Sequence, residues 1–283
     1  MRITKLGATF AARVDGVDLR QRPDDALRDR IEDALAQYGV LVFRGQRLDD
    51  DTQQAFIQSF GPPVVATLKE IRSNHPHFLD IGTVDDDGNP VEASSARGIY
   101  MKANQLWHTD GSQSQPPIRL TALHARRLPK APPPTEYADM RAAWNALPAA
   151  RREALDGLVI EHNIFWSREQ IGMRLEDFSE ETRNARGPVQ HPLVRRHRRT
   201  GQASLYLASH ASHVVGRPMA EGRALLRELI EFATRPEFVH VHDWEPDDLV
   251  MWDDSWTMHR ATPYSGSEPR ALRWCGVREE LPV

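Results

Sequence analysis

The sequence of 283 residues contains a single cysteine, Cys275, and no apolar run long enough to cross a membrane. One cysteine cannot form a disulfide within the chain, which excludes a small disulfide-stabilised secreted fold. A transmembrane helix needs about 20 apolar residues, and a secretory signal needs an apolar segment of roughly 7–15 residues near the start. Neither pattern is present, so we expect a cytoplasmic protein without a membrane partner.

The chain also lacks an excess of positive charge. Its 36 Lys and Arg residues are balanced by 40 Asp and Glu residues, giving a formal net charge of −4. Binding to nucleic acid depends on a basic field that neutralises phosphates, so nucleic acid is not an expected partner. The one basic cluster, Arg195-Arg-His-Arg-Arg199, lies between two short apolar runs and is followed by Thr200-Gly201, a turn signal. We expect this cluster to form the solvated tip of a hairpin.

No repeat with a period of about 20 to 50 residues is present, which excludes repeat architectures. Pro132-Pro-Pro134 is stiff but too short to be a linker between domains. The hydrophobic content of 40% is enough for one substantial core. We therefore expect a single domain over residues 1–283.

The beginning of the chain alternates helical and strand patterns. Residues 24–38 carry apolar side chains at helical spacing and end at Gly39, and residues 50–60 predict a second helix. The short apolar run 40–43 between them predicts a strand. Residues 62–107 are expected to be irregular, and a loop this long in a compact domain is usually a lid or a binding loop. We therefore predict that residues 62–107 form an active-site lid.

The rest of the chain alternates short strand patterns with turns, interrupted by a predicted helix over residues 219–234. Eight short strands are typical of a jelly roll. The predicted fold class is mainly β with helical insertions, with a double-stranded β-helix of the cupin-like type as its core and α-helices on its flanks. The expected strands are 119–124, 135–138, 189–194, 203–208, 238–241, 248–252, 256–261 and 270–277.

The most informative motif is Asn104-Gln-Leu-Trp-His-Thr-Asp110, which ends in a His-x-Asp pair. With 12 histidines in the chain, such a pair also arises by chance. On a strand, alternate side chains share one face, so His108 and Asp110 can reach one ion while Thr109 points away. With His259 they would form a facial triad, which leaves three cis positions open on an octahedral Fe(II) ion.

The residues after His259 favour this metal site. His259 alone could be a hydrogen-bonded core histidine. Arg270 follows it by eleven residues, at the start of a predicted strand that can return beside it. A guanidinium in that place can hold a carboxylate through two parallel hydrogen bonds.

With this arginine the sequence resembles the 2-oxoglutarate-dependent dioxygenases of the taurine dioxygenase and 2,4-dichlorophenoxyacetate dioxygenase group, the TauD/TfdA family. The resemblance covers nearly the whole chain and is closer to the herbicide-degrading branch than to the taurine branch. It rests on Val40-Leu-Val-Phe-Arg-Gly-Gln46, Phe60-Gly-Pro62, the motif 104–110, Thr135-Glu-Tyr-Ala-Asp-Met-Arg-Ala-Ala143, His210-Ala-Ser-His-Val214, Asp248-Leu-Val-Met-Trp-Asp253 and His259-Arg-Ala-Thr262.

The resemblance implies that His108, Asp110 and His259 are iron ligands and that Arg270 binds the distal carboxylate of 2-oxoglutarate. The implied cofactors are Fe(II), 2-oxoglutarate as cosubstrate, and O2. The implied reaction oxidises a C–H bond and releases succinate and CO2. Hydroxylation is favoured over halogenation because halogenating relatives lack a carboxylate at the position of Asp110. Desaturation and epoxidation stay open.

Thr135 matches the family threonine that assists at the same carboxylate, twenty-seven residues after His108. The Gly-Gly-Asp that usually precedes this threonine is replaced here by Pro132-Pro-Pro134. From the residues alone, Thr135 reads as an ordinary strand threonine, so its predicted role comes from the resemblance.

The predicted partner is a small anionic and aromatic substrate, aryloxyalkanoate-like or sulfonate-like. Herbicide-branch relatives often carry an arginine four residues after the cosubstrate arginine, and here that position is Trp274. Trp274 could stack on an aromatic substrate or fill the core. Lys69 matches a lysine of the herbicide-degrading relative, and both Lys69 and Lys102 could instead be solvated. Asn104 and Arg273 complete the candidates for substrate contact, although Arg273 should face away from Trp274.

Two other functions stay open. A zinc-dependent hydrolase or isomerase could use the same three ligands on a cupin-like barrel, which would leave Arg270 without a task. A non-catalytic sensor could bind 2-oxoglutarate and report occupancy through residues 62–107. The family also implies a homo-oligomer, a dimer or a tetramer.

Two further pairs of histidines are expected to be structural. His210 and His213 lie in a predicted loop, and His240 and His242 alternate on a predicted strand. A metal site needs at least three protein ligands, and neither pair has a third one nearby in the sequence.

Overall fold

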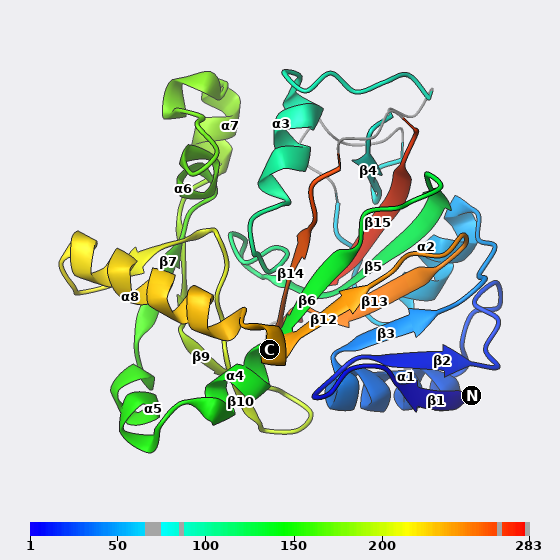
Figure 1. The fold of residues 1–283 in the computed structure, drawn as a ribbon, viewed down its shortest axis with the longest axis horizontal. Helices are drawn as coiled ribbons and strands as arrows, with labels where there is room; N and C mark the ends of the chain where they lie inside the picture. Colours follow the sequence, from blue (N-terminus) through cyan, green and yellow to red (C-terminus); the bar gives the residue numbers. More distant parts are fainter. Residues whose placement is uncertain (66–74, 85–87, 265–267, 281–283) are drawn as a thin grey trace.

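The computed structural model describes residues 1–65, 75–84, 88–264 and 268–280. Its largest element is a seven-stranded sheet, antiparallel except for the parallel pair β2 and β3 (Figure 1). In spatial order its strands are β1 (Arg2–Lys5), β2 (Ala12–Asp15), β3 (Val40–Phe43), β13 (Leu249–Asp253), β5 (Ile118–Arg127), β15 (Ala271–Arg278) and β4 (Leu79–Gly82).

A second, three-stranded antiparallel sheet consists of β12 (Val239–His242), β6 (Thr135–Asp139) and β14 (Thr257–Ala261). A further three-stranded sheet consists of β11 (Ala211–Val214), β7 (Val159–His162) and β8 (Val189–Pro192). The strands β9 (Val194–Arg196) and β10 (Ala203–Leu205) form a separate hairpin. Mainly β architecture with helical insertions is thereby confirmed.

The helices lie outside these sheets (Figure 1). They are α1 (Asp25–Tyr38), α2 (Asp50–Gln58), α3 (Ala96–Ala103), α4 (Met140–Ala146), α5 (Ala149–Leu155), α6 (Ile164–Glu169), α7 (Glu180–Ala185) and α8 (Met219–Ala233), with 3-10 turns at η1 (Leu175–Asp177) and η2 (Pro236–Phe238). None of the helices in the described part of the chain combines the length and the apolar character needed to span a bilayer.

Helices α1 and α2 begin and end at residues that suit those positions. The Asp24 side chain accepts a hydrogen bond from the Leu27 amide, and Asp49 caps α2 in the same way. Helix α1 ends at Gly39, which has a φ of 69°. A Cβ atom at Gly39 would lie 2.3 Å from the ring of Trp256, so only glycine fits between α1 and β3.

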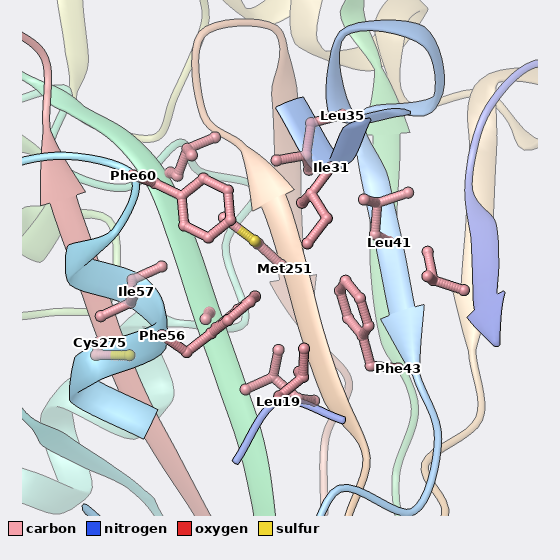
Figure 2. Packing of buried hydrophobic residues seen from close by; sticks show 14 of the residues in the cluster. Leu19, Ile31, Leu35, Leu41, Phe43, Phe56, Ile57, Phe60, Met251 and Cys275 are labelled. Carbon is pink, nitrogen blue, oxygen red and sulfur yellow. The ribbon is translucent and has the colours of Figure 1, made fainter. Parts of the chain in front are cut away.

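The seven-stranded sheet has two apolar faces because alternate residues of a strand point in opposite directions. In β3, Leu41 and Phe43 pack toward α1 and α2, in a cluster that Figure 2 shows from close by. Val40 and Val42 belong to the cluster on the opposite face. Tyr137 of β6 lies in this second cluster, so the two main sheets share a core.

Most predicted elements are confirmed, with boundaries that shift by a few residues. Residues 62–107 are not irregular throughout, because β4 and α3 both lie within this range. Helix α3 is hard to detect because Gly98 in its first turn lowers helix propensity, and the Ser95 side chain compensates by accepting a hydrogen bond from the Gly98 amide. The predicted strand 189–194 is interrupted at Leu193 and divides into β8 and β9.

The predicted hairpin at the basic cluster is confirmed, but its description as a solvated tip is wrong for part of the cluster. Arg195 forms an ion pair with Glu279, with 2.6 Å between Arg195 Nη2 and Glu279 Oε2. His197 is buried, and its Nε2 lies 3.1 Å from Asp253 Oδ2. These contacts attach the hairpin to the body of the molecule, whereas Arg198 remains exposed.

Candidate active site

The three predicted metal ligands meet between the two main sheets. One potential ligand atom from each of His108, Asp110 and His259 lies within 4.8 Å of the others. Among the described residues this is the one group of His, Cys, Asp and Glu side chains with such geometry. The structure therefore brings together residues from two segments that are far apart in the sequence.

Backbone pairing places His108 beside His259. The His108 amide donates to the His259 carbonyl over 3.0 Å, and the His259 amide donates back over 2.8 Å. His108 forms an isolated bridge rather than part of a regular strand, so the strand expected there is reduced to one pair. The alternation still holds, because the Thr109 hydroxyl points elsewhere and donates to the Leu207 carbonyl. Gly111 then turns the chain sharply, with a φ of 65°.

Burial favours the neutral form of both imidazoles, which is the form that binds metals. Burial is the main cause that lowers the pKa of His108, and burial with the neighbouring His108 lowers the pKa of His259 far below its ordinary value. The His108 Nδ1 lies 2.7 Å from the Leu106 carbonyl and is placed to donate to it, which leaves the Nε2 lone pair facing Asp110. The His259 ring stacks on Tyr137, with 6.0 Å between centroids.

Asp110 is oriented by three hydrogen bonds. Its Oδ2 accepts from Trp274 Nε1 at 2.9 Å and from Thr121 Oγ1 at 3.2 Å, and its amide donates to Asp254 Oδ1 at 3.1 Å. No hydrogen bond from a described residue reaches Oδ1, which lies 3.7 Å from His108 Nε2. Asp110 thus has one oxygen held by the protein and one available to an ion.

Asp254 supports this arrangement from a fully buried position. Burial, followed by the charge of Asp110, raises the pKa of Asp254 well above its usual range. Its Oδ1 accepts a hydrogen bond from Trp252 Nε1 at 3.0 Å, and its Oδ2 lies 2.7 Å from Thr121 Oγ1, the hydroxyl whose single hydrogen is directed to Asp110. Asp254 therefore positions Asp110 and is not part of the ligand cluster.

A cavity that is partly open to solvent contains the three predicted ligands. Seven of its thirteen lining residues are apolar or aromatic, and the other six carry polar groups that converge on one site, as expected for a small-molecule site. It is lined by Ile81, Tyr100, Asn104, His108, Asp110, Leu123, Thr135, Trp252, His259, Ala261, Arg270, Leu272 and Trp274.

Arg270 lies in this cavity and forms no ion pair with a residue that the structure describes. Only 6% of the residue is exposed, its Nε has no hydrogen-bond partner in the described structure, and burial lowers its pKa to about 10. Thr135 lines the same cavity, and its Oγ1 accepts a hydrogen bond from Trp244 Nε1 over 3.0 Å. The Thr135 hydroxyl hydrogen is therefore free to be donated to a ligand.

The candidates for substrate contact divide into two groups. Asn104 and Trp274 line the cavity, although the single N–H group of the Trp274 side chain already donates a hydrogen bond to Asp110. Arg273 points to the other face of the sheet, where it pairs with two carboxylates, so its predicted substrate contact is wrong. Lys102 is exposed and does not line the cavity, and Lys69 lies outside the described residues.

The two additional histidine pairs remain structural. His210 Nδ1 lies 3.1 Å from Ser112 Oγ, and His242 Nε2 lies 3.4 Å from Asp248 Oδ2. Neither pair belongs to a potential metal cluster within the described residues.

Sequence reasoning missed the apolar wall of the cavity and the support by Asp254. Ile81, Leu123 and Leu272 carry only a general signal for buried strand residues. Tyr100 belongs to α3, which was expected to be irregular. The sequence has no feature that separates these residues from ordinary core positions.

The donor set fits Fe(II) with a bound dicarboxylate. Two neutral imidazoles and one carboxylate on one side of an ion match the facial arrangement of non-haem iron enzymes. Arg270, buried without a counter-ion, adds a binding position for a carboxylate in the same cavity. A hydrolytic zinc site would use the three ligands and leave this arginine unexplained.

Comparison with known proteins also supports an iron site that binds a dicarboxylate. A family model described as taurine catabolism dioxygenase TauD, TfdA family, matches residues 2–275. The alpha-ketoglutarate-dependent 2,4-dichlorophenoxyacetate dioxygenase of Cupriavidus pinatubonensis is 42% identical over 268 residues, covering 93% of this chain and 93% of the relative. The enzyme of the same name from a Burkholderia species is 41% identical, covering 93% of this chain and 90% of the relative. The crystal structure of AAD-2 with Mn(II) and N-oxalylglycine superposes with a TM-score of 0.90 at 36% identity, covering 99% of this chain and 98% of that one.

Proposed function

The chain belongs to the TauD/TfdA family, and on this premise we propose that it hydroxylates a C–H bond of a small aryloxyalkanoate-like acid. It is an Fe(II)- and 2-oxoglutarate-dependent dioxygenase that also uses O2 and acts on a small molecule. The observation that carries the proposal is the cavity in which the His108, Asp110 and His259 cluster lies beside the unpaired Arg270.

We assign His108, Asp110 and His259 as the iron ligands. Their support is the clustering of the three donor atoms and the neutral state of both imidazoles. When bound, the metal supplies open coordination positions for the cosubstrate and O2 and the redox chemistry of the reaction. The protein orients Asp110 through the hydrogen bonds of Trp274 and Thr121 to Oδ2, which leaves Oδ1 beside His108 without a described hydrogen-bond donor.

Arg270 and Thr135 are assigned to the distal carboxylate of 2-oxoglutarate. The Arg270 guanidinium lies in a buried environment, where a charge-assisted pair with a carboxylate is strong. Trp244 donates to the Thr135 oxygen, which directs the hydroxyl hydrogen toward another acceptor. Together the two residues hold the cosubstrate in one orientation, and the carboxylate of the cosubstrate compensates the buried positive charge of Arg270.

The substrate assignment rests on the cavity wall and on the relatives. Apolar and aromatic side chains such as Ile81, Leu123 and Trp274 suit an aryl group. The relatives at 41–42% identity are dioxygenases of 2,4-dichlorophenoxyacetate, an aryloxyalkanoate, and relatives that act on sulfate esters are 28% identical. An aryloxyalkanoate is therefore favoured over a sulfate ester.

Four further features belong to the proposal. The two facing sheets form a double-stranded β-helix of the jelly-roll type, and residues 1–283 form one domain. Residues 62–107 act as an active-site lid, supported by Tyr100 and Asn104 in the cavity wall. The protein acts in the cytoplasm as a homodimer or homotetramer.

An anaerobic titration tests the proposal. Metal-free protein receives Fe(II) and then 2-oxoglutarate, and visible absorption is recorded for wild type, Asp110→Ala, Arg270→Ala and Arg273→Ala. We expect a charge-transfer band that requires both additions, is lost in Asp110→Ala, weakens in Arg270→Ala and persists in Arg273→Ala. With O2 and phenoxyacetate, wild-type protein should form succinate. A folded protein that binds zinc but forms no band would refute the proposal in favour of a zinc enzyme.

A further inference from the structure

We infer that Arg168 binds the carboxylate of the organic substrate, at a position distinct from Arg270. The inference deepens the proposed function and depends on it, since it names the group that anchors the acid. Arg168 is the fifth residue of α6, a helix of the layer beside the main sheets (Figure 1).

Arg168 is buried and held in one place. Only 8% of the residue is exposed, and its Nη1 donates to Ser167 Oγ over 3.1 Å. Ser167 Oγ lies 3.0 Å from Ser209 Oγ, and the Ser209 amide donates to the Trp107 carbonyl over 2.8 Å. This chain of contacts connects the guanidinium to the residue directly before His108.

Among the described residues, three arginines are buried, and they differ in their partners. Arg119 forms a bidentate pair with Glu32, with 3.0 Å for each of the two hydrogen bonds. Arg168 and Arg270 form no ion pair with a described carboxylate. A buried guanidinium without a counter-ion is costly, and a bound anion would remove that cost.

The position of Arg168 relative to the cavity is given by Tyr100. The Arg168 guanidinium lies over the Tyr100 ring, 5.4 Å from its centroid, and Tyr100 lines the cavity. Arg168 is not itself one of the residues that line the cavity, and its guanidinium lies against Tyr100, which forms part of the wall. The contact between α3 and α6 therefore places a buried positive charge directly beside the cavity wall.

The other candidates for this anion are already engaged or directed elsewhere. Trp274 donates its N–H to Asp110, and Arg273 is paired with Asp50 and Asp80 on the opposite face. Lys102 is exposed. Arg168 and Arg270 are the buried unpaired cations of the described chain, and Arg270 is assigned to 2-oxoglutarate.

The alternative is a structural role, in which Arg168 is retained for its contact with Tyr100. Cation–π contacts of this kind contribute about 0.5–2 kcal/mol. A structural arginine would affect folding and leave the preference for an acidic substrate unchanged, which separates the two explanations experimentally.

The test compares Arg168→Gln and Arg168→Lys with Arg183→Gln, a control in which an exposed arginine of the neighbouring helix α7 loses the same charge. Each variant is loaded with Fe(II) and 2-oxoglutarate, and phenoxyacetate or its neutral amide is added while the absorption band is followed. Succinate formation then gives KM values for phenoxyacetate and 2-oxoglutarate. The band before addition of phenoxyacetate reports on the intact site.

We expect Arg168→Gln to raise the apparent Kd and KM for phenoxyacetate by about 10- to 100-fold, with the KM for 2-oxoglutarate within about twofold of wild type. The Kd and KM of Arg168→Lys for phenoxyacetate should lie between those of wild type and Arg168→Gln. Arg183→Gln should have the same values as wild type. Wild-type protein should bind the acid at least about tenfold better than the amide, and Arg168→Gln should lose this preference.

Equal responses of wild type and Arg168→Gln to phenoxyacetate would overturn the inference and leave the proposed function intact. If Arg168→Gln does not fold, a wild-type protein that does not prefer the acid over the amide would also overturn it. A wild-type protein whose band does not respond to phenoxyacetate at all would overturn both the anchor and the proposed substrate.

Discussion

Arg270 and Arg273 lie three residues apart, yet their side chains have opposite surroundings. Arg273 pairs with Asp50 and Asp80 on the helix-covered face of the seven-stranded sheet, with its side chain 15% exposed. Arg270 lies in the cavity and has no ion pair with a described residue. A paired arginine stabilises the fold, whereas a buried arginine left unpaired marks a place for an anion.

The two faces of the same sheet repeat this difference on a larger scale. On the helix-covered face, aliphatic and aromatic side chains pack against each other, and the one cysteine, Cys275, accepts a hydrogen bond from Gln53 (Figure 2). On the opposite face, His259 Nδ1 and Arg270 Nε are buried without partners in the described structure. On the first face the arginines Arg126 and Arg273 are paired with carboxylates, whereas on the second Arg270 has no described carboxylate partner.

The largest expected effect is on cosubstrate binding in Arg270→Gln. Removing the guanidinium should weaken 2-oxoglutarate binding by about 100- to 1,000-fold, or ~3–4 kcal/mol, because a desolvated carboxylate pair is lost. Arg270→Lys should recover only part of this, since an ammonium cannot form the two parallel hydrogen bonds. The anaerobic absorption titration measures both. An unchanged affinity of Arg270→Gln for 2-oxoglutarate would contradict the conclusion that the unpaired arginine binds an anion.

Arg273→Gln should instead affect the fold. We expect the free energy of unfolding to fall by about 1–3 kcal/mol, because Asp80 and Asp50 lose a largely buried partner while Asp50 remains partly solvated. The KM for 2-oxoglutarate should not change. Chemical denaturation and steady-state succinate assays test the two halves of this prediction, and a raised KM with unchanged stability would contradict it.

Trp274→Phe removes one hydrogen bond and keeps most of the ring volume. Trp274 Nε1 donates a hydrogen bond to Asp110 Oδ2. Losing this hydrogen bond should reduce Fe(II) affinity about tenfold, which is the smaller of the losses typical of mutations in groups that orient metal ligands. Calorimetric titration under anaerobic conditions measures the affinity. Trp144→Phe, a buried tryptophan of α4 in a different cluster, is the control and should bind Fe(II) like wild type.

The smallest effect concerns a buried histidine outside the cavity. Burial, with smaller contributions from His191 and Arg195, lowers the pKa of His162 to about 3. Between about pH 6.5 and 3 the unfolded chain takes up a proton at this residue that the folded protein does not, so stability falls as pH falls. His162→Phe should remove this contribution. When the pH is lowered from 7.5 to 5.5, the free energy of unfolding of the variant should therefore decrease by about 1 kcal/mol less than that of wild type. Urea denaturation at the two pH values tests this, and identical losses would refute it.

Much of the fold was predictable because it depends on local patterns. Helix α1 has apolar residues at helical spacing between Asp24 and Gly39, and β3 is a short apolar run that follows directly. The α3 helix was not predicted, because its stability depends on a cap at Ser95 and on packing of Tyr100 against the core. Its residues by themselves lack a strong helical pattern.

The sequence by itself was sufficient to propose His108, Asp110, His259 and Arg270, because chemistry restricts metal ligands and carboxylate binders to few residue types and the motifs keep their spacing. The contacts of three other residues were decided only by the tertiary structure. Trp274 reaches Asp110 across 164 positions of the chain, Arg273 pairs with Asp50 across 223, and Arg168 is buried against Tyr100 of another helix. Each depends on which distant side chain folding brings within hydrogen-bonding or packing distance, and a linear pattern does not contain that information.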